Sequence, residues 1–366
     1  MNIGIVSKWV ASGQAIVSRQ IRSALDELGH DTFVLARPGS GPRAAAAAEG
    51  EIDPVWDQPG VTQGTEHEMP VAEYEEWARA NSLELILFDE NYQWDAVGAL
   101  RESGVRTVGR FVWEYFSSEH VEPAKAAYDV VYSMHMGERE RYAEMGIESP
   151  YVQWGIHPEL LEAAERAASS EQQAASRGDR VTFYFPGSFL GRRKPIRKVI
   201  KAFGQAQGDH LRLLVNAQVP RNDDKLQKWA DADPRIELML EDEPEDEHRA
   251  RFASCDVALA PSRWEGLGLP LFEATAFGLP IITNDKPPMA EMVLDGRSGI
   301  LVPSERNGEA RSGIPAWDPD VAALAAAIER LGDRAELERM REGVAELRER
   351  RRWERTVADL GELVGG

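Results

Sequence analysis

The chain has 366 residues, more than one ordinary hydrophobic core requires, and its 43% hydrophobic and 28% charged residues are typical of a globular protein with two domains. Sixty-two acidic and 42 basic residues give a formal net charge of −20, which repels phosphate groups and argues against nucleic acid and generic anionic membranes as partners. The sequence has no run of about 18 apolar residues that could cross a bilayer, so stable membrane insertion is not expected.

The leading residues and the cysteine content both favour a cytoplasmic protein. Residues 2–6 form a strand-like apolar run, without the basic stretch, long apolar segment and cleavage site of a secretory signal. Cys255 is the single cysteine and cannot form an intramolecular disulfide, so we expect a buried thiol without a chemical role. The excess of carboxylates with few lysines fits adaptation to strong salt, and a genome composition biased towards Arg and Ala explains the shortage of lysine about as well.

The N-terminal half alternates predicted strands with predicted helices. A strand at 2–6 is followed by a loop through Ser12 and Gly13 and by an amphipathic helix near 16–28. Further apolar runs suited to strands lie at 32–35, 84–88, 106–112, 129–132 and 150–153, with helical stretches such as 93–102 and 136–145. This alternation predicts a parallel sheet covered by helices on both faces.

A second unit of the same kind follows. Residues 166–179 are small and polar, as expected for a linker between two cores. Beyond them we expect strands at 181–186, 211–215, 235–240 and 256–259, helices at 195–206, 223–231 and 245–253, and three closing helices at 318–331, 333–350 and 352–364. The resulting prediction is a Rossmann-like lobe at 1–165, a second at 180–345, and a last helix, 346–366, that returns to the N-terminal lobe.

The segment with most chemical information is 261–280, which predicts a loop and then a short helix after an apolar strand. Glu265 would lie in the loop and Glu273 in the helix. Gly266 and Gly268 let the backbone approach a ligand, and the free amides at a helix N-terminus favour an anion such as a diphosphate. Because carboxylates accept hydrogen bonds from sugar hydroxyls, the segment predicts a nucleotide-sugar site at the carboxyl ends of parallel strands.

These residues belong to a longer ordered set. Glu265 and Glu273 are followed by Gly-Leu-Pro-Ile-Ile-Thr-Asn-Asp at 278–285, by Glu291, and by Asp-Gly-Arg-Ser-Gly-Ile-Leu-Val at 295–302. The set resembles the signature of retaining glycosyltransferases of family 4, which have the GT-B fold. The resemblance implies an α/β chain of two Rossmann-like lobes facing a central cleft. It also implies a retaining hexosyltransferase that moves a sugar from a nucleotide-diphosphate sugar to an acceptor hydroxyl.

The resemblance also implies roles for single residues in donor binding. Glu273 would bind the ribose hydroxyls of the nucleotide, and Glu265 would contact the donor sugar where the bonds are exchanged. The backbone amides of Gly266, Leu267 and Gly268 would meet the sugar and the phosphates. The C-terminal lobe therefore carries the donor in this interpretation, and the N-terminal lobe carries the acceptor.

The same family places an arginine and a lysine on the donor diphosphate, in the loop after the first strand of the second lobe. Lys194 matches the lysine. The usual arginine position is held by Ser188 or Phe189, so Arg192 or Arg193 would have to substitute. Two cations lower the barrier because negative charge grows on the departing diphosphate. The sequence has no metal motif, and the resemblance implies an enzyme that needs neither metal nor cofactor beyond its nucleotide-sugar co-substrate.

The N-terminal lobe departs from the family pattern. Family members often place a histidine after the fourth strand, near the donor sugar, and Glu114 stands at or near that position here. We therefore expect Glu114 to orient the donor sugar or the acceptor hydroxyl. Gly13, in the first strand-to-helix turn, fits ordinary turn chemistry and a close approach to the donor phosphate equally well.

Two alternatives remain open at this point. The missing arginine and histidine are compatible with a catalytically inactive nucleotide-sugar-binding or partner subunit. A sugar-nucleotide epimerase of the same fold is a second alternative, although its motifs are not evident. The donor (a UDP-, GDP- or ADP-sugar) and the acceptor (a sugar, a lipid or a small molecule) are not fixed by the sequence, because bases are commonly recognised by backbone and acceptors by variable loops.

Overall fold

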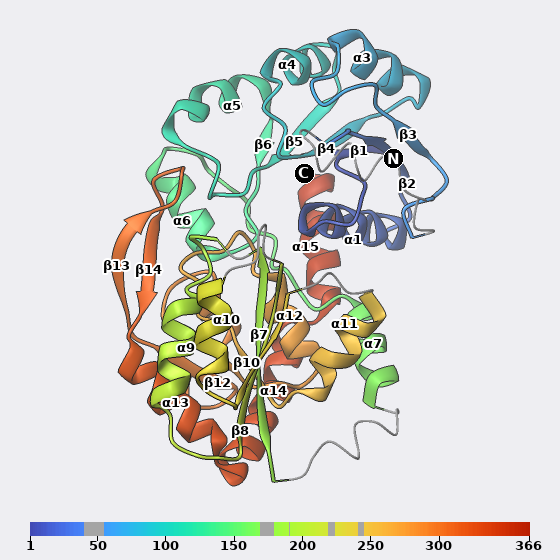
Figure 1. Cartoon of the computed structure of the whole chain (residues 1–366). Helices are drawn as coiled ribbons and strands as arrows, with labels where there is room; N and C mark the ends of the chain where they lie inside the picture. Colours follow the sequence, from blue (N-terminus) through green and yellow to red (C-terminus); the bar gives the residue numbers. More distant parts are fainter. Residues whose placement is uncertain (40–54, 169–178, 190, 219–223, 241–244) are drawn as a thin grey trace. The chain divides into compact units, whose positions relative to one another are not determined.

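A computed structural model describes residues 1–39, 55–168, 179–189, 191–218, 224–240 and 245–366 (Figure 1). They form two compact units, one of Met1–Trp154 with Glu354–Gly366 and one of Gly155–Trp353. Each unit is built around its own six-stranded parallel sheet. The prediction of an α/β chain with two Rossmann-like lobes is therefore confirmed.

The sheet of the first unit has the strand order β3-β2-β1-β4-β5-β6. Its strands are β1 (Asn2–Ser7), β2 (Asp31–Ala36), β3 (Val61–Gln63), β4 (Leu85–Asp89), β5 (Arg106–Arg110) and β6 (Val130–Val131). Its helices are α1 (Gly13–Glu27), α3 (Val71–Ala80), α4 (Trp94–Glu102), η1 (Ser118–His120), α5 (Val121–Ala127) and α6 (Met136–Glu144). The first strand, β1, lies in the middle of the sheet, and the strand order runs outward from it in both directions. The order reverses between β1 and β4, and sheets of this kind bind ligands at such a point.

Two short elements of the first unit differ from the prediction. Residues 150–153 form no strand, and only Tyr151 makes an isolated bridge, with Ser133. The run begins with Pro150, which has no N–H for a ladder and instead accepts a hydrogen bond from the Ser133 N–H. Strand β3 was not predicted because it has three residues, two of them exposed, and so carries no apolar alternation.

The last helix, α15 (Trp353–Gly365), packs on the first unit. Asp359 accepts a hydrogen bond from the Gln153 N–H at 2.9 Å, and the Thr356 hydroxyl donates to the Gln153 carbonyl at 2.7 Å. At the other end of the helix, Arg106 donates to the carbonyl of Val364 at 3.0 Å. These bonds join the C-terminal segment to β5 and to the residues that end the first unit.

The boundary between the units lies at residues 154 and 155, earlier than the linker expected at 166–179. Most of that linker, 169–178, lies outside the described residues. Helix α7 (Pro158–Ala168) precedes it and packs against α11 and α12 of the second unit. Because α7 is amphipathic and buries its apolar face there, the composition change after it does not coincide with the change of core.

The sheet of the second unit has the order β12-β11-β10-β7-β8-β9, the same winding as the first. Its strands are β7 (Val181–Phe189), β8 (Leu211–Gln218), β9 (Ile236–Met239), β10 (Val257–Leu259), β11 (Ile281–Asn284) and β12 (Gly299–Val302). Its remaining helices are α9 (Ile196–Gln205), α10 (Asp224–Asp231), α11 (Glu245–Ser254), α12 (Leu269–Ala276), η2 (Met289–Met292), α13 (Val321–Gly332) and α14 (Arg334–Arg350). Helices α9, α10 and α13 lie on one face, and α11, α12 and α14 on the other (Figure 1).

A two-stranded antiparallel hairpin, β13 (Ser304–Glu309) and β14 (Pro315–Pro319), follows β12. The sequence did not predict it, because β13 is polar and almost wholly exposed and so lacks the alternation of a half-buried strand. The helix expected from residue 318 begins at Val321 instead. Asp320 caps it by accepting a hydrogen bond from the Ala323 N–H at 2.7 Å.

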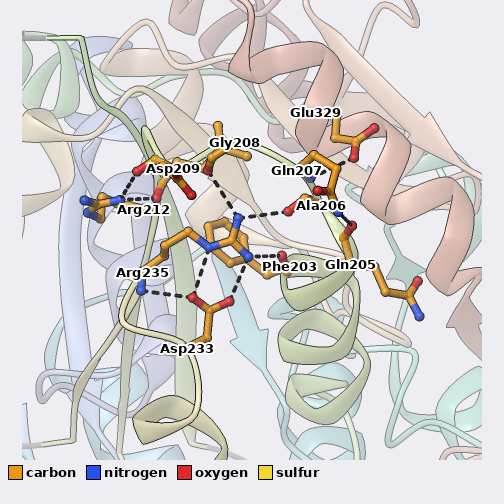
Figure 2. Close-up of polar contacts among 11 residues, drawn as sticks. Phe203, Gln205, Ala206, Gln207, Gly208, Asp209, Arg212, Asp233, Arg235 and Glu329 are labelled. Carbon is orange, nitrogen blue, oxygen red and sulfur yellow. Dashed lines mark hydrogen bonds and ion pairs between the residues drawn. The ribbon is translucent and has the colours of Figure 1, made fainter.

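Arg235, just before β9, closes the end of helix α9 (Figure 2). Its guanidinium donates to the carbonyls of Phe203 at 3.0 Å, Ala206 at 2.8 Å and Gly208 at 3.2 Å. Asp233 accepts from Nε at 3.0 Å and from Nη2 at 2.8 Å. The last carbonyls of a helix have no partner within it, so Arg235 supplies the missing donors and joins α9 to β9. This contact lies at the amino end of β9, away from the strand ends that bind ligands.

We expect Arg235→Ala to lower the free energy of unfolding by about 1–3 kcal/mol, because it removes the side-chain donors to part-buried carbonyls and to Asp233. The hydrogen bond from Arg235 lowers the pKa of Asp233. A carboxyl with a lowered folded pKa stabilises the fold above its unfolded pKa, about 3.9, and loses that contribution as the pH falls through the folded pKa. Asp233→Asn should therefore be destabilising at pH 7 and less destabilising near pH 3.

Urea denaturation of the full chain at both pH values measures these effects. The control is Arg212→Ala, since Arg212 is in the same network but donates only to the carbonyls of Asp209 and Leu211 beside it. Equal losses for the two arginine variants would contradict the capping role of Arg235.

Candidate functional site

The candidate site lies at the carboxyl ends of β7 and β10. These two strands are neighbours in the second sheet, and the strand order reverses between them. The loop after β7 carries Arg192, Arg193 and Lys194 and leads into α9. The backbone N–H of Lys194 donates to the carbonyl of Gly191 at 3.2 Å, which closes the loop as a tight turn. Three consecutive basic side chains are thus presented at one strand end.

The loop after β10 brings a carboxylate to the same place. It contains Glu265 and ends at Gly268, which precedes α12. Gly268 has φ +79°, a left-handed conformation that favours glycine, and a Cβ there would lie 3.3 Å from the Leu271 side chain. Pro270 occupies the first turn of α12, where its missing N–H costs nothing. The glycine lets the loop turn sharply into the helix, so Glu265 stays in the loop.

Lys194 and Glu265 form a buried ion pair. The Lys194 Nζ lies 2.6 Å from Glu265 Oε1 and donates to the Ser262 Oγ at 3.0 Å. Arg193 Nη1 lies 3.5 Å from the second carboxylate oxygen of Glu265. Lys194 and Glu265 are only 5% and 6% exposed, so each charge depends on the other and on Ser262. Glu265 therefore holds two cations of the β7 loop together.

Burial of Glu265 opposes its ionisation, but the charges of Lys194 and Arg193 and the hydrogen bonds outweigh it, and its pKa is lowered. The carboxylate is therefore ionised at neutral pH. Asn284, at the end of β11, supports the arrangement by donating to the carbonyls of Ser262 at 2.8 Å and Trp317 at 2.9 Å. Glu265 and Ser262 of the β10 loop thus hold the Lys194 ammonium group, and Asn284 of β11 holds the backbone of that loop.

The other residues predicted for the donor lie on the same segments. Gly266 and Leu267 continue the loop after Glu265. Glu273 is half-buried on α12, so the expected arrangement of one glutamate before the helix and one within it holds. Arg192 is exposed, and its backbone carbonyl accepts a hydrogen bond from Arg263.

The residues predicted in the N-terminal lobe lie in the first unit. Gly13 is exposed and starts α1, whose N-cap Ser12 accepts a hydrogen bond from the Ala15 N–H at 3.3 Å. Glu114 lies in the turn after β5 and is 7% exposed. His120, six residues after Glu114, accepts a hydrogen bond from the Ser117 N–H, so its ring is held in η1.

A charged cluster at the carboxyl ends of β2, β4 and β5 was not predicted. Arg110 Nη1 lies 2.8 Å from Asp89 Oδ1, and Arg37 Nη2 donates to the Glu90 carbonyl at 2.7 Å. Glu90 has φ +51°, unusual for a residue with a side chain, and its carboxyl accepts from the Val112 N–H. Burial and the neighbouring Asp89 raise the pKa of Glu90 to about 8. The sequence feature that could have indicated this cluster is the Asp-Glu pair that directly follows an apolar strand.

Other kinds of site are not found in the part of the chain that the structure describes. There, no group of three or more His, Cys, Asp or Glu residues could hold a metal ion. None of the helices described is long and apolar enough to span a membrane. Cys255 is buried, and burial raises the pKa of its thiol to about 12, so it stays protonated and unreactive.

One family model matches the part of the chain that bears the candidate site. The family model described as "Glycosyl transferases group 1" matches residues 180–334. That range contains Lys194, Glu265 and Glu273. A curated protein of Klebsiella pneumoniae, "Uncharacterized 41.2 kDa protein in cps region", is 45% identical over 53 residues, which are 14% of this chain and 15% of that protein.

Solved structures of similar fold cover the whole chain. Sucrose-phosphate synthase from Thermosynechococcus elongatus has a TM-score of 0.72 and 18% identity over 100% of this chain and 98% of its own. A glycosyltransferase from Rickettsia africae has a TM-score of 0.76 and 12% identity over 99% and 98%. Anabaena HepE, solved in complex with UDP and glucose, has a TM-score of 0.69 and 14% identity over 100% and 98%. At these identities the likeness establishes the fold, which is GT-B.

The buried ion pair predicts a pH-dependent cost of removing its lysine. Lys194→Met should lower the free energy of unfolding by about 3–5 kcal/mol at pH 7, because it leaves the Glu265 carboxylate buried with one cation fewer. In the wild type the pKa of Glu265 is lower in the folded than in the unfolded chain, so its ionisation stabilises the fold at pH values above the unfolded pKa of about 4.3. This stabilisation is lost as the pH falls through the folded pKa. In the variant burial dominates, so protonation relieves the cost and the deficit should shrink towards pH 4.

Denaturation of both forms at pH 7 and pH 4 checks this expectation. The double variant Lys194→Met/Glu265→Gln should lose less than the sum of its single variants. An additive loss that does not change with pH would show that the two side chains are not coupled.

Proposed function

We propose, on the premise that residues 180–334 match the group 1 glycosyl transferases and the whole chain has the GT-B fold, that this protein transfers a sugar from a nucleotide-diphosphate sugar to an acceptor hydroxyl with retention of configuration. The observation that carries the proposal is the buried Lys194–Glu265 pair, with Arg193 beside it, at the carboxyl ends of β7 and β10. A fixed cation group next to a carboxylate is suited to a ligand that has both phosphates and hydroxyls.

The donor diphosphate would lie between the basic loop and the start of α12. Lys194 and Arg193 would contact its oxygens, and the backbone amides of Gly266, Leu267 and Gly268 would add donors at the helix N-terminus. Arg193, whose guanidinium already lies 3.5 Å from Glu265, is the better substitute for the family's arginine. The exposed side chain of Arg192 is then outside the site.

Glu273, half-buried on α12, would accept hydrogen bonds from the ribose hydroxyls, and Glu265 would contact the donor sugar. UDP and UDP-glucose are the first ligands to test, because HepE was solved with both. Uridine is not selected by any contact described above, so GDP- and ADP-sugars belong in the same panel.

In the proposed reaction the bond from the anomeric carbon to the diphosphate oxygen breaks, and a bond from the acceptor oxygen to that carbon forms on the same face. The acceptor proton passes to a phosphate oxygen of the departing nucleotide. Lys194 and Arg193 stabilise the negative charge that grows on this leaving group, which is the function a divalent ion has in other transferases. The reaction would need no metal, and Glu114 would orient the donor sugar or the acceptor hydroxyl.

Donor affinity separates the residues that this proposal places in the site from their neighbours. Glu273→Ala should weaken UDP binding by about 10- to 100-fold, since it removes hydrogen bonds from a charged acceptor to the ribose. Arg193→Ala should weaken it by about tenfold, while Arg192→Ala serves as the matched control in the same loop and should change it less than twofold. Isothermal titration calorimetry of the full chain measures all three. Equal effects of the two arginine variants would remove Arg193 from the phosphate site.

The products of transfer test the stereochemistry and the role of Glu114. Glu114→Gln should keep about one-hundredth of the wild-type rate and the donor's anomeric configuration, because a positioning group is lost but no nucleophile is. Proton NMR of the product gives the configuration, and the assay in the presence of a chelator tests the need for metal. An inverted product, a glycosylated Glu114 peptide, or activity lost with the chelator and regained with a divalent ion would each contradict the proposal. Donor binding without turnover would favour an inactive binding subunit.

A further inference from the structure

Arg263, between Ser262 and Trp264 of the site loop, contacts the basic loop from outside the ion pair. Its Nη1 donates to the carbonyl of Arg192 at 2.9 Å, and its backbone N–H donates to the carbonyl of Arg193 at 2.9 Å. One residue thus binds two consecutive peptide groups, directly before Lys194. The turn that presents the cations is fixed to the loop that presents Glu265.

The same guanidinium is held by the hairpin β13–β14. Its Nε lies 2.5 Å from Asp318 Oδ1, and its Nη2 donates to the carbonyl of Asn307. The carbonyl of Arg263 accepts from the Trp317 N–H at 2.9 Å. Arg263 is therefore bound by both strands of the hairpin, and its planar fork reaches three segments at once.

Asp318 is itself fixed by further donors. Asn307 Nδ2 donates to Oδ2 at 2.6 Å, and Lys198 of α9 lies 3.2 Å from the same oxygen. Burial of Asp318 opposes its ionisation, but these hydrogen bonds and the charges of Arg263 and Lys198 outweigh it, and its pKa is lowered. Both the Arg263 and Asp318 side chains are largely buried, at 13% and 9% exposed, so this pair is more than a surface contact.

We infer that Arg263 is a positioning residue for the donor diphosphate site: anchored by Asp318 of the hairpin, it fixes the backbone of the Arg192–Lys194 loop so that Arg193 and Lys194 face the ligand. The hairpin thereby supports the site through its contacts with Arg263. The consequence for donor binding rests on the proposed function, whereas the effect on the loop does not.

Hydrogen exchange tests the effect on the loop without any ligand. In Arg263→Ala, amides in peptides covering residues 191–194 should exchange about tenfold faster than in the wild type, because the Arg192 carbonyl has lost its side-chain donor and only the backbone N–H at position 263 still holds the loop. Arg263→Lys should restore little of the wild-type protection from exchange, because an ammonium group lacks the planar fork with which the guanidinium reaches three segments. The control Arg306→Ala, an exposed arginine of the same hairpin paired with Glu309, should leave the loop unchanged. Unchanged exchange of residues 191–194 in Arg263→Ala would overturn the inference.

A double-mutant cycle on UDP affinity tests the consequence for binding. Arg263→Ala should weaken UDP binding about tenfold in the wild type, and less than twofold when Arg193 and Lys194 are already alanine, because Arg263 acts through those cations. A purely structural role would give the same fold-change in both backgrounds, which would overturn the inference. A wild-type chain that binds no nucleotide would refute the proposed function, and hydrogen exchange would then decide the role of Arg263 by itself.

Discussion

The buried ion pair of Lys194 and Glu265 is the constraint on which the rest of the candidate site depends. A buried charge is costly unless it is paired and hydrogen-bonded, so neither side chain can be placed without the other. The two residues are 71 positions apart in the chain, and they meet because β7 and β10 are neighbours in the sheet. The parallel strand order thus brings two loops to one point, and the ion pair fixes their separation.

The local cations matter more than the charge of the whole chain. At a net charge of −20 the protein repels a diphosphate at long range. At physiological ionic strength, dissolved salt screens interactions between charges that are more than about 8 Å apart. An approaching anion therefore responds mainly to charges closer than that distance. At the candidate site the cations Lys194 and Arg193 lie 2.6 Å and 3.5 Å from the carboxylate oxygens of Glu265. The acidic surface then opposes non-specific anions while the site keeps its own preference.

The sequence predicted those parts of the structure that depend on local pattern. The alternation of apolar runs and helical stretches predicted most strands of the two sheets, but not β3, β11 or β12. The glycine and proline spacing placed Glu265 in a loop and Glu273 on a helix. Gly299, part of the family-like set, has a packing reason: a Cβ there would lie 2.1 Å from the Ile281 carbonyl oxygen. Contacts between distant segments were not predictable, as with Arg263 and Asp318 or Glu90 and Val112. Their partners are set by tertiary packing, and no spacing along the chain encodes them.

The ion pair also means that the proposed donor must share Lys194 with Glu265. At 2.6 Å the carboxylate already occupies one direction of the ammonium group, and Ser262 occupies a second, which leaves its third N–H for a phosphate oxygen. Glu265 lowers the affinity for an anion relative to a free lysine, but it holds the ammonium in place before the ligand arrives. A cation that needs no reorganisation stabilises a leaving group more than it stabilises a bound substrate, because the leaving group carries more negative charge. In the proposed reaction the pair would therefore weaken donor binding in the ground state and favour stabilisation of the transition state, which is the direction that accelerates transfer.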